Sequence, residues 1–359
     1  MLKKSTSFLI AVCLALPLWA QVRGNIDIPN LNGYITLKCD FHMHTVFSDG
    51  LVWPTVRVDE AYREGLDAIA ITDHIEYRPH KEIVASRNRS YEIAKTKADE
   101  MGIIVIQGSE ITRKMPPGHS NALFINDAEL LDTPEYLDAF RAAKAQNAFI
   151  VWNHPHWDRQ QPDTTLWMDE HTQLFQEGLM NGIEVVNYFY CPEAHQWCLD
   201  KKLTMLGNSD MHHPMQSKVD FAAGKHRTMT LVFAKEATAE GIREALLERR
   251  TAVYHDEYVI GEEKYLKELF ENALEWKVEK PTDSTARIIV KNNSDFTFHL
   301  KKTQHDPSLI YFRETSIVPH GEHTFFIRLR SGIQGGDINF SVENFFVLPN
   351  EGMKYSVKI

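Results

Sequence analysis

Residues 39–50 read CDFHMHTVFSDG, and the rest of the chain can be understood from this stretch. His42 and His44 follow residues 34–41, whose apolar and β-branched positions predict a β-strand. Residues i and i+2 of a strand point to one face, so both imidazoles can reach one point, as two ligands of a metal must. Asp49, in the Ser-Asp-Gly turn that follows, offers a carboxylate to the same place. Solvated histidines also give this pattern, so the prediction depends on its recurrence downstream.

Short apolar strands alternate with amphipathic helices from about residue 31 to residue 248, which predicts an α/β domain built of β/α units around a parallel sheet. The expected strands are 35–41, 68–72, 103–107, 121–125, 149–153, 183–187 and 204–207. The expected helices include 56–64, 81–101, 134–146 and 165–179. Seven strands suggest a barrel, closed or nearly so, with its functional groups at the carboxyl ends of the strands.

Candidate metal ligands occur at or beside the ends of most of these strands. The set is His42, His44, Asp49, His74, Glu110, His119, His154, Asp210 and His212. His119 precedes its strand, so either this strand is antiparallel or its loop returns to the rim. Each residue alone also has an ordinary explanation, such as a solvated histidine or a turn aspartate. Nine ligands together exceed the needs of one ion, so two or three divalent ions are expected, and this ligand set suits Zn, Mn or Fe.

The N-terminus predicts a secretory signal peptide over residues 1–20, because two lysines precede the apolar run 8–19 and a small residue, Ala20. The alternative is a lipoprotein signal with Cys13 as the modified residue, which the large Val12 disfavours. No other long apolar stretch follows, so a periplasmic or secreted protein without a membrane span is expected. The net charge of −10 argues against a nucleic-acid polymer as partner. It still permits a small phosphorylated substrate, because bound cations reverse the local field.

The character of the sequence changes near residue 272. From there, short segments alternate apolar and polar residues between turn clusters, which predicts a small antiparallel β-sandwich of about seven strands. The expected organisation is therefore a signal over 1–20, an α/β barrel over 31–270 and a β-sandwich over 272–359. Cys191 and Cys198 are close enough in sequence to form a disulfide in an oxidising compartment.

The motifs HMHTVFSDG, ITDH, GSE, GHS, NHP and SDMH, in this order, resemble those of the PHP (polymerase and histidinol phosphatase) superfamily over about residues 37–248. With its signal and sandwich, the chain resembles the exported bacterial phosphodiesterase branch. The resemblance implies a distorted (β/α)7 barrel that hydrolyses a small phosphoester with a metal-bridging hydroxide. It implies one metal on His42, His44 and Asp210, a second on Glu110 (bridging), His119 and His154, and a third on Asp49, His74 and His212.

Further catalytic candidates lie beside the ligands. Besides Asp210, we consider His156 and His213 as acids for the leaving alcohol, although they could instead orient their neighbours. Arg113 could hold a phosphoryl oxygen, or be a solvated charge on the rim. The aromatic residues near the rim could stack an aryl group or a base, or simply pack the barrel end. They are Trp152, Trp157, Tyr188, Phe189 and Tyr190.

Three alternatives remain beside a phosphodiesterase. The first is a phosphomonoesterase of the same fold. The second is a metal-dependent amidohydrolase, a class that usually carries a metal-bridging lysine at a strand end; none follows the second to fifth expected strands. The third is a non-catalytic metal-binding or carbohydrate-surface protein, against which the complete ligand set argues.

Overall fold

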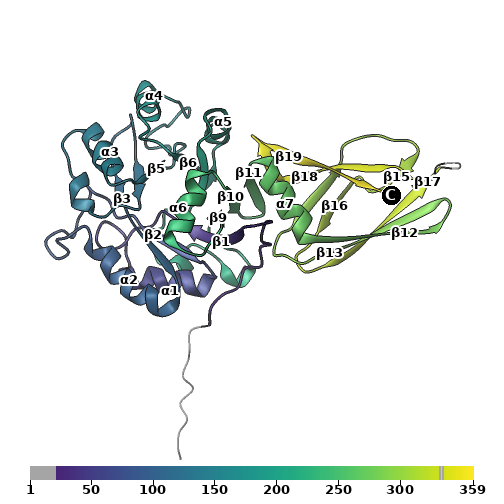
Figure 1. Ribbon diagram of the computed structural model, residues 1–359, viewed down its shortest axis with the longest axis horizontal. Coiled ribbons are helices and arrows are strands. Elements are labelled where there is room, and N and C mark those ends of the chain that lie inside the picture. Colours follow the sequence, from purple (N-terminus) through teal and green to yellow (C-terminus); the bar gives the residue numbers. More distant parts are fainter. Residues whose placement is uncertain (1–21, 331–332, 334) are drawn as a thin grey trace, which may run out of the picture.

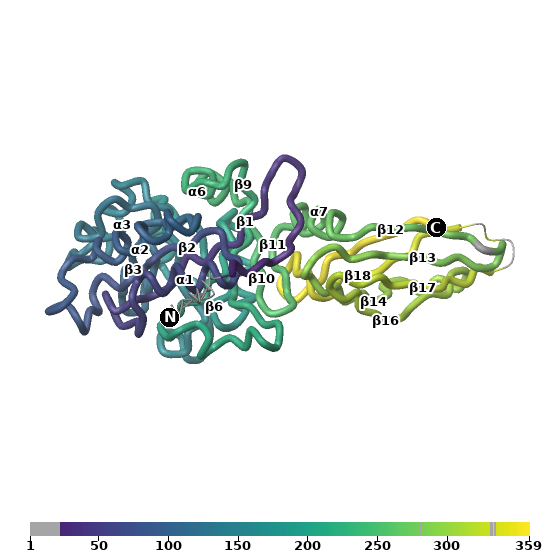
Figure 2. The backbone as a smooth tube through the Cα atoms, turned by 90° about the horizontal axis from the view of Figure 1, so that it is seen from below, coloured from purple at the N-terminus to yellow at the C-terminus, as the bar shows by residue number. Residues whose placement is uncertain are grey.

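The computed structural model describes residues 22–330, 333 and 335–359, so the predicted signal peptide lies outside the described residues. The described chain is elongated, with an α/β domain at one end and a β-rich domain at the other (Figure 1). Figure 2, turned by 90°, shows the same division. In the described part of the chain, no helix combines the length and apolar character needed to cross a bilayer.

The barrel sheet pairs seven strands in the order β1-β2-β3-β4-β5-β6-β8. They are β1 (Ile35–Asp40), β2 (Ala68–Ile71), β3 (Ile104–Ile111), β4 (Ser120–Leu123), β5 (Phe149–Trp152), β6 (Gly182–Asn187) and β8 (Thr204–Asn208). All neighbours are parallel except β4, which is antiparallel to both β3 and β5. Beyond β8, Met211 forms a parallel bridge with Met43, which brings the last strand back to the first. The predicted α/β barrel is therefore confirmed.

Helices pack against the outside of this sheet (Figure 1). They are α1 (Pro54–Glu64), α2 (Arg89–Met101), α3 (Tyr136–Ala145), α4 (Asp169–Gln176), α5 (Pro192–Lys201) and α6 (Ala239–Leu247), with short 3₁₀ turns η1 (Ala128–Leu131), η2 (Met215–Ser217) and η3 (Phe221–Ala223). The helix predicted over 81–101 begins only at Arg89, and the one predicted over 165–179 is shorter at both ends. Helix α5 was not predicted, although Pro192 at its first position is a start signal.

Three strands and one helix extend the α/β domain and link it to the C-terminal domain. Strand β9 (Met229–Ala234) runs antiparallel to β1 and is followed by β10 (Thr251–His255), β11 (Tyr258–Gly261) and helix α7 (Glu263–Ala273). Strand β11 then pairs in parallel with β18 (Asp337–Leu348), so one sheet continues from one domain into the other. A two-residue strand, β7 (Phe189–Tyr190), folds back on the end of β6.

The C-terminal domain is the predicted antiparallel sandwich. One sheet holds β12 (Leu274–Thr282), β13 (Thr285–Asn292), β17 (Glu322–Leu329) and β15 (Leu309–Ile310); the other holds β16 (Glu314–Ile317), β14 (Phe298–Lys302), β18 and β19 (Glu351–Lys358). Buried and exposed residues alternate along β13 and β17, as expected of strands with one face on a core. One continuous hydrophobic core contains both Leu231 of the barrel and Phe298 of the sandwich.

The disulfide suggested for Cys191 and Cys198 is absent, and both thiols are free and buried. Cys191 caps the N-terminus of α5 and Cys198 lies in the same helix seven residues later. At about 1.5 Å of rise per residue, their Cα atoms are roughly 10 Å apart along the axis, beyond the reach of a disulfide.

Candidate metal centre

The floor of the site is formed by the two histidines that follow β1. His42 and His44 are fully buried, and their Nε2 atoms lie 3.1 Å apart. Asp210, on the loop after β8, places Oδ1 3.2 Å from His42 Nε2 and 3.1 Å from His44 Nε2. Three ligand atoms from the first and last barrel strands therefore converge on one point.

Glu110 occupies the middle of the site. It lies near the end of β3, is fully buried, and is surrounded by imidazoles. Its Oε1 lies 3.1 Å from His119 Nδ1 and 3.4 Å from His154 Nε2. Its Oε2 lies 2.5 Å from His74 Nδ1. His119 reaches this position because β4 is antiparallel, so that its amino end faces the same rim as the carboxyl ends of its neighbours.

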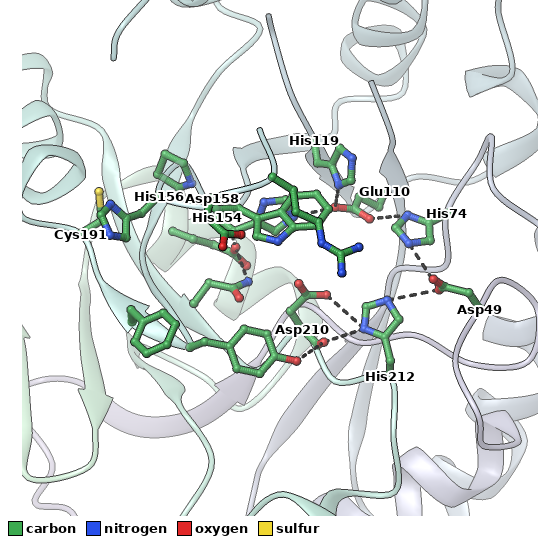
Figure 3. A pocket seen from close by; sticks show the side chains of 17 residues that line it. Asp49, His74, Glu110, His119, His154, His156, Asp158, Cys191, Asp210 and His212 are labelled. Carbon is green, nitrogen blue, oxygen red and sulfur yellow. Dashed lines mark hydrogen bonds and ion pairs between the residues drawn. The ribbon is translucent and has the colours of Figure 1, made fainter. Parts of the chain in front are cut away.

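A third part of the site surrounds Asp49. Its Oδ1 lies 3.4 Å from His74 Nε2 and 3.2 Å from His212 Nε2. The rings of His74 and His212 both stack on His44, with centroids 4.3 and 4.1 Å away. Figure 3 shows the labelled residues as an arc that runs from His119 through Glu110, His74 and Asp49 to His212 and Asp210.

All nine predicted ligands thus come together, in four overlapping groups whose ligand atoms lie within 4.8 Å of one another. The groups are His44-Asp49-His74-His212, His42-His154-Asp210, His42-His44-Glu110 and Glu110-His119-His154. The grouping agrees with the expected one in the central place of Glu110 and in the set around Asp49. It differs in that His154 also joins His42 and Asp210, and His44 joins the set around Asp49.

Two of these residues have an uncommon backbone conformation. His154 has φ 30° and Asp210 has φ 49°, in the left-handed region that residues other than glycine avoid. Such conformations cost on the order of 1–3 kcal/mol each and are typical of functional sites. His154 lies two residues after the end of β5, and Asp210 lies two residues after the end of β8.

A cavity of about 600 Å³ opens over the arc. The lining also includes Tyr188, whose hydroxyl donates to the backbone carbonyl of Asp210 at 3.1 Å, and Phe189, the first residue of β7. Their exposed fractions are 50% and 72%. Trp157 forms another part of the lining, with its ring 5.1 Å from that of His154. Of the aromatic residues predicted near the rim, Trp152 is instead buried, stacked on His171 with centroids 3.8 Å apart.

Each of the two domains matches a known protein family. Residues 40–195 match the family model of the PHP domain, and residues 274–358 match that of an Ig-like domain. A crystal structure of a two-domain protein from Bacteroides vulgatus, described as containing a predicted PHP-like metal-dependent phosphoesterase, is 56% identical. It covers 95% of this chain and 100% of its own, with a TM-score of 0.93. The chain belongs to the PHP family.

Two curated relatives match a shorter part of the chain. An uncharacterized protein of Methanocaldococcus jannaschii is 42% identical over 81 residues, 23% of this chain and 36% of its own. A 5'-3' exoribonuclease of Haemophilus influenzae is 37% identical over 78 residues, 22% of this chain and 24% of its own. The matched segments span only about a quarter to a third of these relatives.

Glu184 is a residue of the PHP site that the sequence analysis missed. It is buried on β6, where its Oε1 accepts from His42 Nδ1 at 2.8 Å and from Asn208 Nδ2 at 2.9 Å. Its Oε2 accepts from the backbone N–H of His154 and from Asn187 Nδ2, both at 2.8 Å. Glu184 therefore fixes the ring of His42 with Nε2 toward the centre. In the sequence, the feature that could have indicated this role is a glutamate inside the otherwise largely apolar strand GIEVVN.

The histidines of the floor have opposite pKa shifts. Burial disfavours a charged His42, but the carboxylates of Asp210, Glu184 and Glu110 outweigh it and raise its pKa to about 10. Burial and the neighbouring His74 and His212 lower the pKa of His44 to about 3. The pKa of Glu110 lies well below its usual value: burial opposes this, but the imidazoles around it prevail. The carboxylates of the PHP site thus favour positive charge at its centre, as a site for cations requires.

Two predicted residues do not reach the cavity. The guanidinium of Arg113 pairs with Glu76 at 2.8 Å and donates to the carbonyls of Thr133 and Pro134. His213 is exposed, and its carbonyl accepts from Arg57. Neither lines the cavity. The structure therefore does not bring Arg113 or His213 to the cavity, because local partners hold the Arg113 guanidinium and His213 is exposed.

His156 does line the cavity, but at the opposite end from the arc, beside Cys191 (Figure 3). Its Nδ1 lies 2.9 Å from Thr165 Oγ1. Among the described lining residues the one Arg or Lys is Arg159, whose guanidinium lies 5.9 Å from the centroid of the Trp157 ring.

Proposed function

We propose that this protein is a metal-dependent phosphoesterase that hydrolyses a small phosphodiester. The observation that carries the proposal is the convergence of nine imidazole and carboxylate ligands around Glu110 at the floor of an open cavity. The similarity to the Bacteroides vulgatus protein, described as containing a predicted PHP-like metal-dependent phosphoesterase, supports the reaction class.

The donors of the site fit divalent ions. Asp49 Oδ1 faces the Nε2 atoms of His74 and His212, and Glu110 Oε2 faces His74 Nδ1. Carboxylate oxygens and imidazole nitrogens grouped in this way are the donor types that divalent transition-metal ions take. The Nε2 atoms of His42 and His44, 3.1 Å apart, face the same oxygen of Asp210. Two or three ions of the Zn, Mn or Fe type would be held by the nine ligands, and when bound they would supply an activated water and neutralise phosphoryl charge.

The aromatic part of the cavity lining favours a diester over a monoester. A phosphate with one ester group needs little room beyond the ions, whereas a diester carries two organic groups. Tyr188 and Phe189 offer exposed aromatic faces to such a group, and aromatic faces stack on flat rings. Arg159 adds a single cation to the lining, which suits a singly charged phosphodiester.

An amidohydrolase has less support. The described residues that line the cavity include no lysine that could bridge two metals.

The test compares bis(p-nitrophenyl) phosphate, p-nitrophenyl phosphate and p-nitroacetanilide as substrates of the purified chain loaded with Mn²⁺, Zn²⁺ or Fe²⁺. We expect the highest kcat/KM for the diester. His42→Ala should abolish the activity, because it removes a buried ligand. The matched control is Glu236→Gln, an exposed residue far along the chain from any ligand, which should keep full activity.

Three results would count against the proposal. Turnover of none of the phosphoesters would reject the reaction class, and equal activity in His42→Ala would reject the site. A higher kcat/KM for the monoester would reject the diester preference alone. Metal analysis of the same samples should give two to three equivalents in the wild-type chain, and fewer in His42→Ala.

A further inference from the structure

A second group of metal-ligating side chains lies at the far end of the cavity. The ligand atoms of His156, Cys191 and Glu193 lie within 4.8 Å of one another. None of the three belongs to the nine ligands of the PHP centre. In Figure 3, His156 and Cys191 lie side by side, apart from the arc that runs from His119 to Asp210.

Two separate segments bring these residues together. His156 lies on the loop that follows β5, and its Nδ1 faces Thr165 Oγ1 at 2.9 Å, which leaves Nε2 available as a ligand. A hydrogen bond to the second ring nitrogen is the usual means of orienting a metal-binding imidazole. Cys191 is fixed by its backbone N–H, which donates to Val185 O at 2.8 Å, and Glu193 follows in the first turn of α5.

The three residues differ in burial in a way that suits a binding site. Cys191 is 1% exposed, yet it contributes to the cavity lining. His156 and Glu193 are exposed and free to adjust by the small distance that coordination requires. The Sγ of Cys191 already lies 3.6 Å from Glu193 Oε2. A buried thiol between an imidazole and a carboxylate is an unusual combination for a surface with a purely structural role.

We propose that His156, Cys191 and Glu193 bind one thiophilic divalent cation of the zinc type, at a site separate from the PHP centre. Thiolate, imidazole and carboxylate are all zinc ligands, and a thiolate selects zinc or cobalt over magnesium, calcium and manganese. The thiol proton passes to solvent when the cation binds. Three protein ligands leave the fourth tetrahedral position open. Because His156 and Cys191 line the cavity, the bound cation borders the space that a substrate would enter.

Cobalt provides a direct test, because a thiolate bonded to Co²⁺ gives a charge-transfer band in the near ultraviolet. The nine ligands of the PHP centre include no sulfur, so cobalt there cannot give this band. We expect the full chain titrated with Co²⁺ to show the band, and Zn²⁺ to displace it. Cys191→Ala should lose the band and one equivalent of bound zinc.

The matched control is Cys198→Ala, which removes a second buried thiol of the same helix that bonds to Thr204 O rather than to this cluster. It should keep the band. His156→Ala and Glu193→Gln alter exposed residues, so they should fold normally, lose the extra equivalent of zinc and weaken cobalt binding at least about tenfold. They decide the question if Cys191→Ala does not fold.

The inference is overturned if the wild-type chain gives no sulfur-to-cobalt band, or if the band survives Cys191→Ala. It is also overturned if His156→Ala and Glu193→Gln bind as much zinc as the wild type. The result does not depend on the proposed phosphodiesterase activity, because the band is read without substrate. An inactive protein with the band would reject the proposed function and keep this site.

Discussion

At the scale of single residues, the site depends on buried polar groups that orient its ligands. Glu184 accepts four hydrogen bonds and binds two segments that carry ligands, through His42 and the backbone of His154. Partners of this kind typically contribute a factor of about 10–100 to metal affinity. We therefore expect Glu184 to contribute to metal affinity although it is not one of the nine ligands.

We therefore expect Glu184→Gln to weaken metal binding about 10- to 100-fold, because an amide keeps the size but replaces one acceptor oxygen with a donor. Competition with a fluorescent chelator measures the affinity. Glu236→Gln makes the same chemical change at an exposed position and should bind metal like the wild type. Equal affinity of both variants would show that Glu184 does not orient His42.

His171 gives a prediction for pH. It is fully buried; its Nδ1 accepts from Met168 N–H at 2.9 Å and its Nε2 donates to Pro117 O at 2.8 Å, so the folded protein holds it neutral. Burial lowers its pKa below the value of about 6.5 expected in the unfolded chain. A lowered pKa contributes stability that is present above pH 6.5 and is lost as the pH falls below it.

The free energy of unfolding should therefore fall less steeply below pH 6.5 in His171→Gln than in the wild type. Urea unfolding of the chelator-treated protein at several pH values measures the slopes. The exposed His80→Gln variant is the control and should keep the wild-type slope. If the free energy of unfolding falls equally steeply with pH in His171→Gln and in the wild type, His171 is not held neutral in the folded protein.

At the scale of elements, helix α1 joins the two loops that complete the centre. Arg57 of α1 is fully buried and donates to the carbonyls of His44 at 3.0 Å and Met211 at 2.7 Å. It also pairs with Glu60 at 2.7 Å. The loop after β1 and the loop after β8 are thus held by one guanidinium.

Arg57→Met should cost about 3–5 kcal/mol of unfolding free energy, because it leaves the buried Glu60 and several carbonyls without their partner. Arg63→Met alters an exposed residue of the same helix and should stay within about 0.5 kcal/mol of the wild type. Urea unfolding compares the two. A loss below about 1 kcal/mol in Arg57→Met would mean that water replaces the guanidinium.

The elements also show where prediction from sequence stopped. The hydrophobic pattern indicated all seven barrel strands, but the direction of β4 was left open between two explanations for His119. Pairing decided it, because β4 is antiparallel to both neighbours. The direction of a strand depends on hydrogen bonds between segments, which a one-dimensional pattern does not record.

At the scale of the whole molecule, the two domains share one sheet and one core. Strand β11 pairs with β18 through Val259 and Phe345, and Phe345 packs on Phe296 and Phe298 with ring centroids 5.5 and 5.1 Å away. The same core includes residues of the barrel such as Leu231. A shared core couples the stability of the two parts.

We expect the metal-free protein to unfold in a single calorimetric transition, and Phe345→Ala to lower the free energy of that whole transition by about 3–5 kcal/mol. Phe326→Ala, which truncates a phenylalanine that is 75% exposed on β17, should have little effect. Two separate transitions in the wild type would show that the domains are independent.

The sequence by itself determined the residue types of the centre and their place at strand ends, because the period of the hydrophobic pattern and the position of each ligand are local properties. It also determined the division into an α/β barrel and a β-sandwich. Tertiary structure alone decided which ligands share a group, that Arg113 is held by Glu76, that Glu184 orients His42, and that His156 meets Cys191. These depend on distances between segments far apart in the chain, which are set only when the barrel closes and its loops pack together.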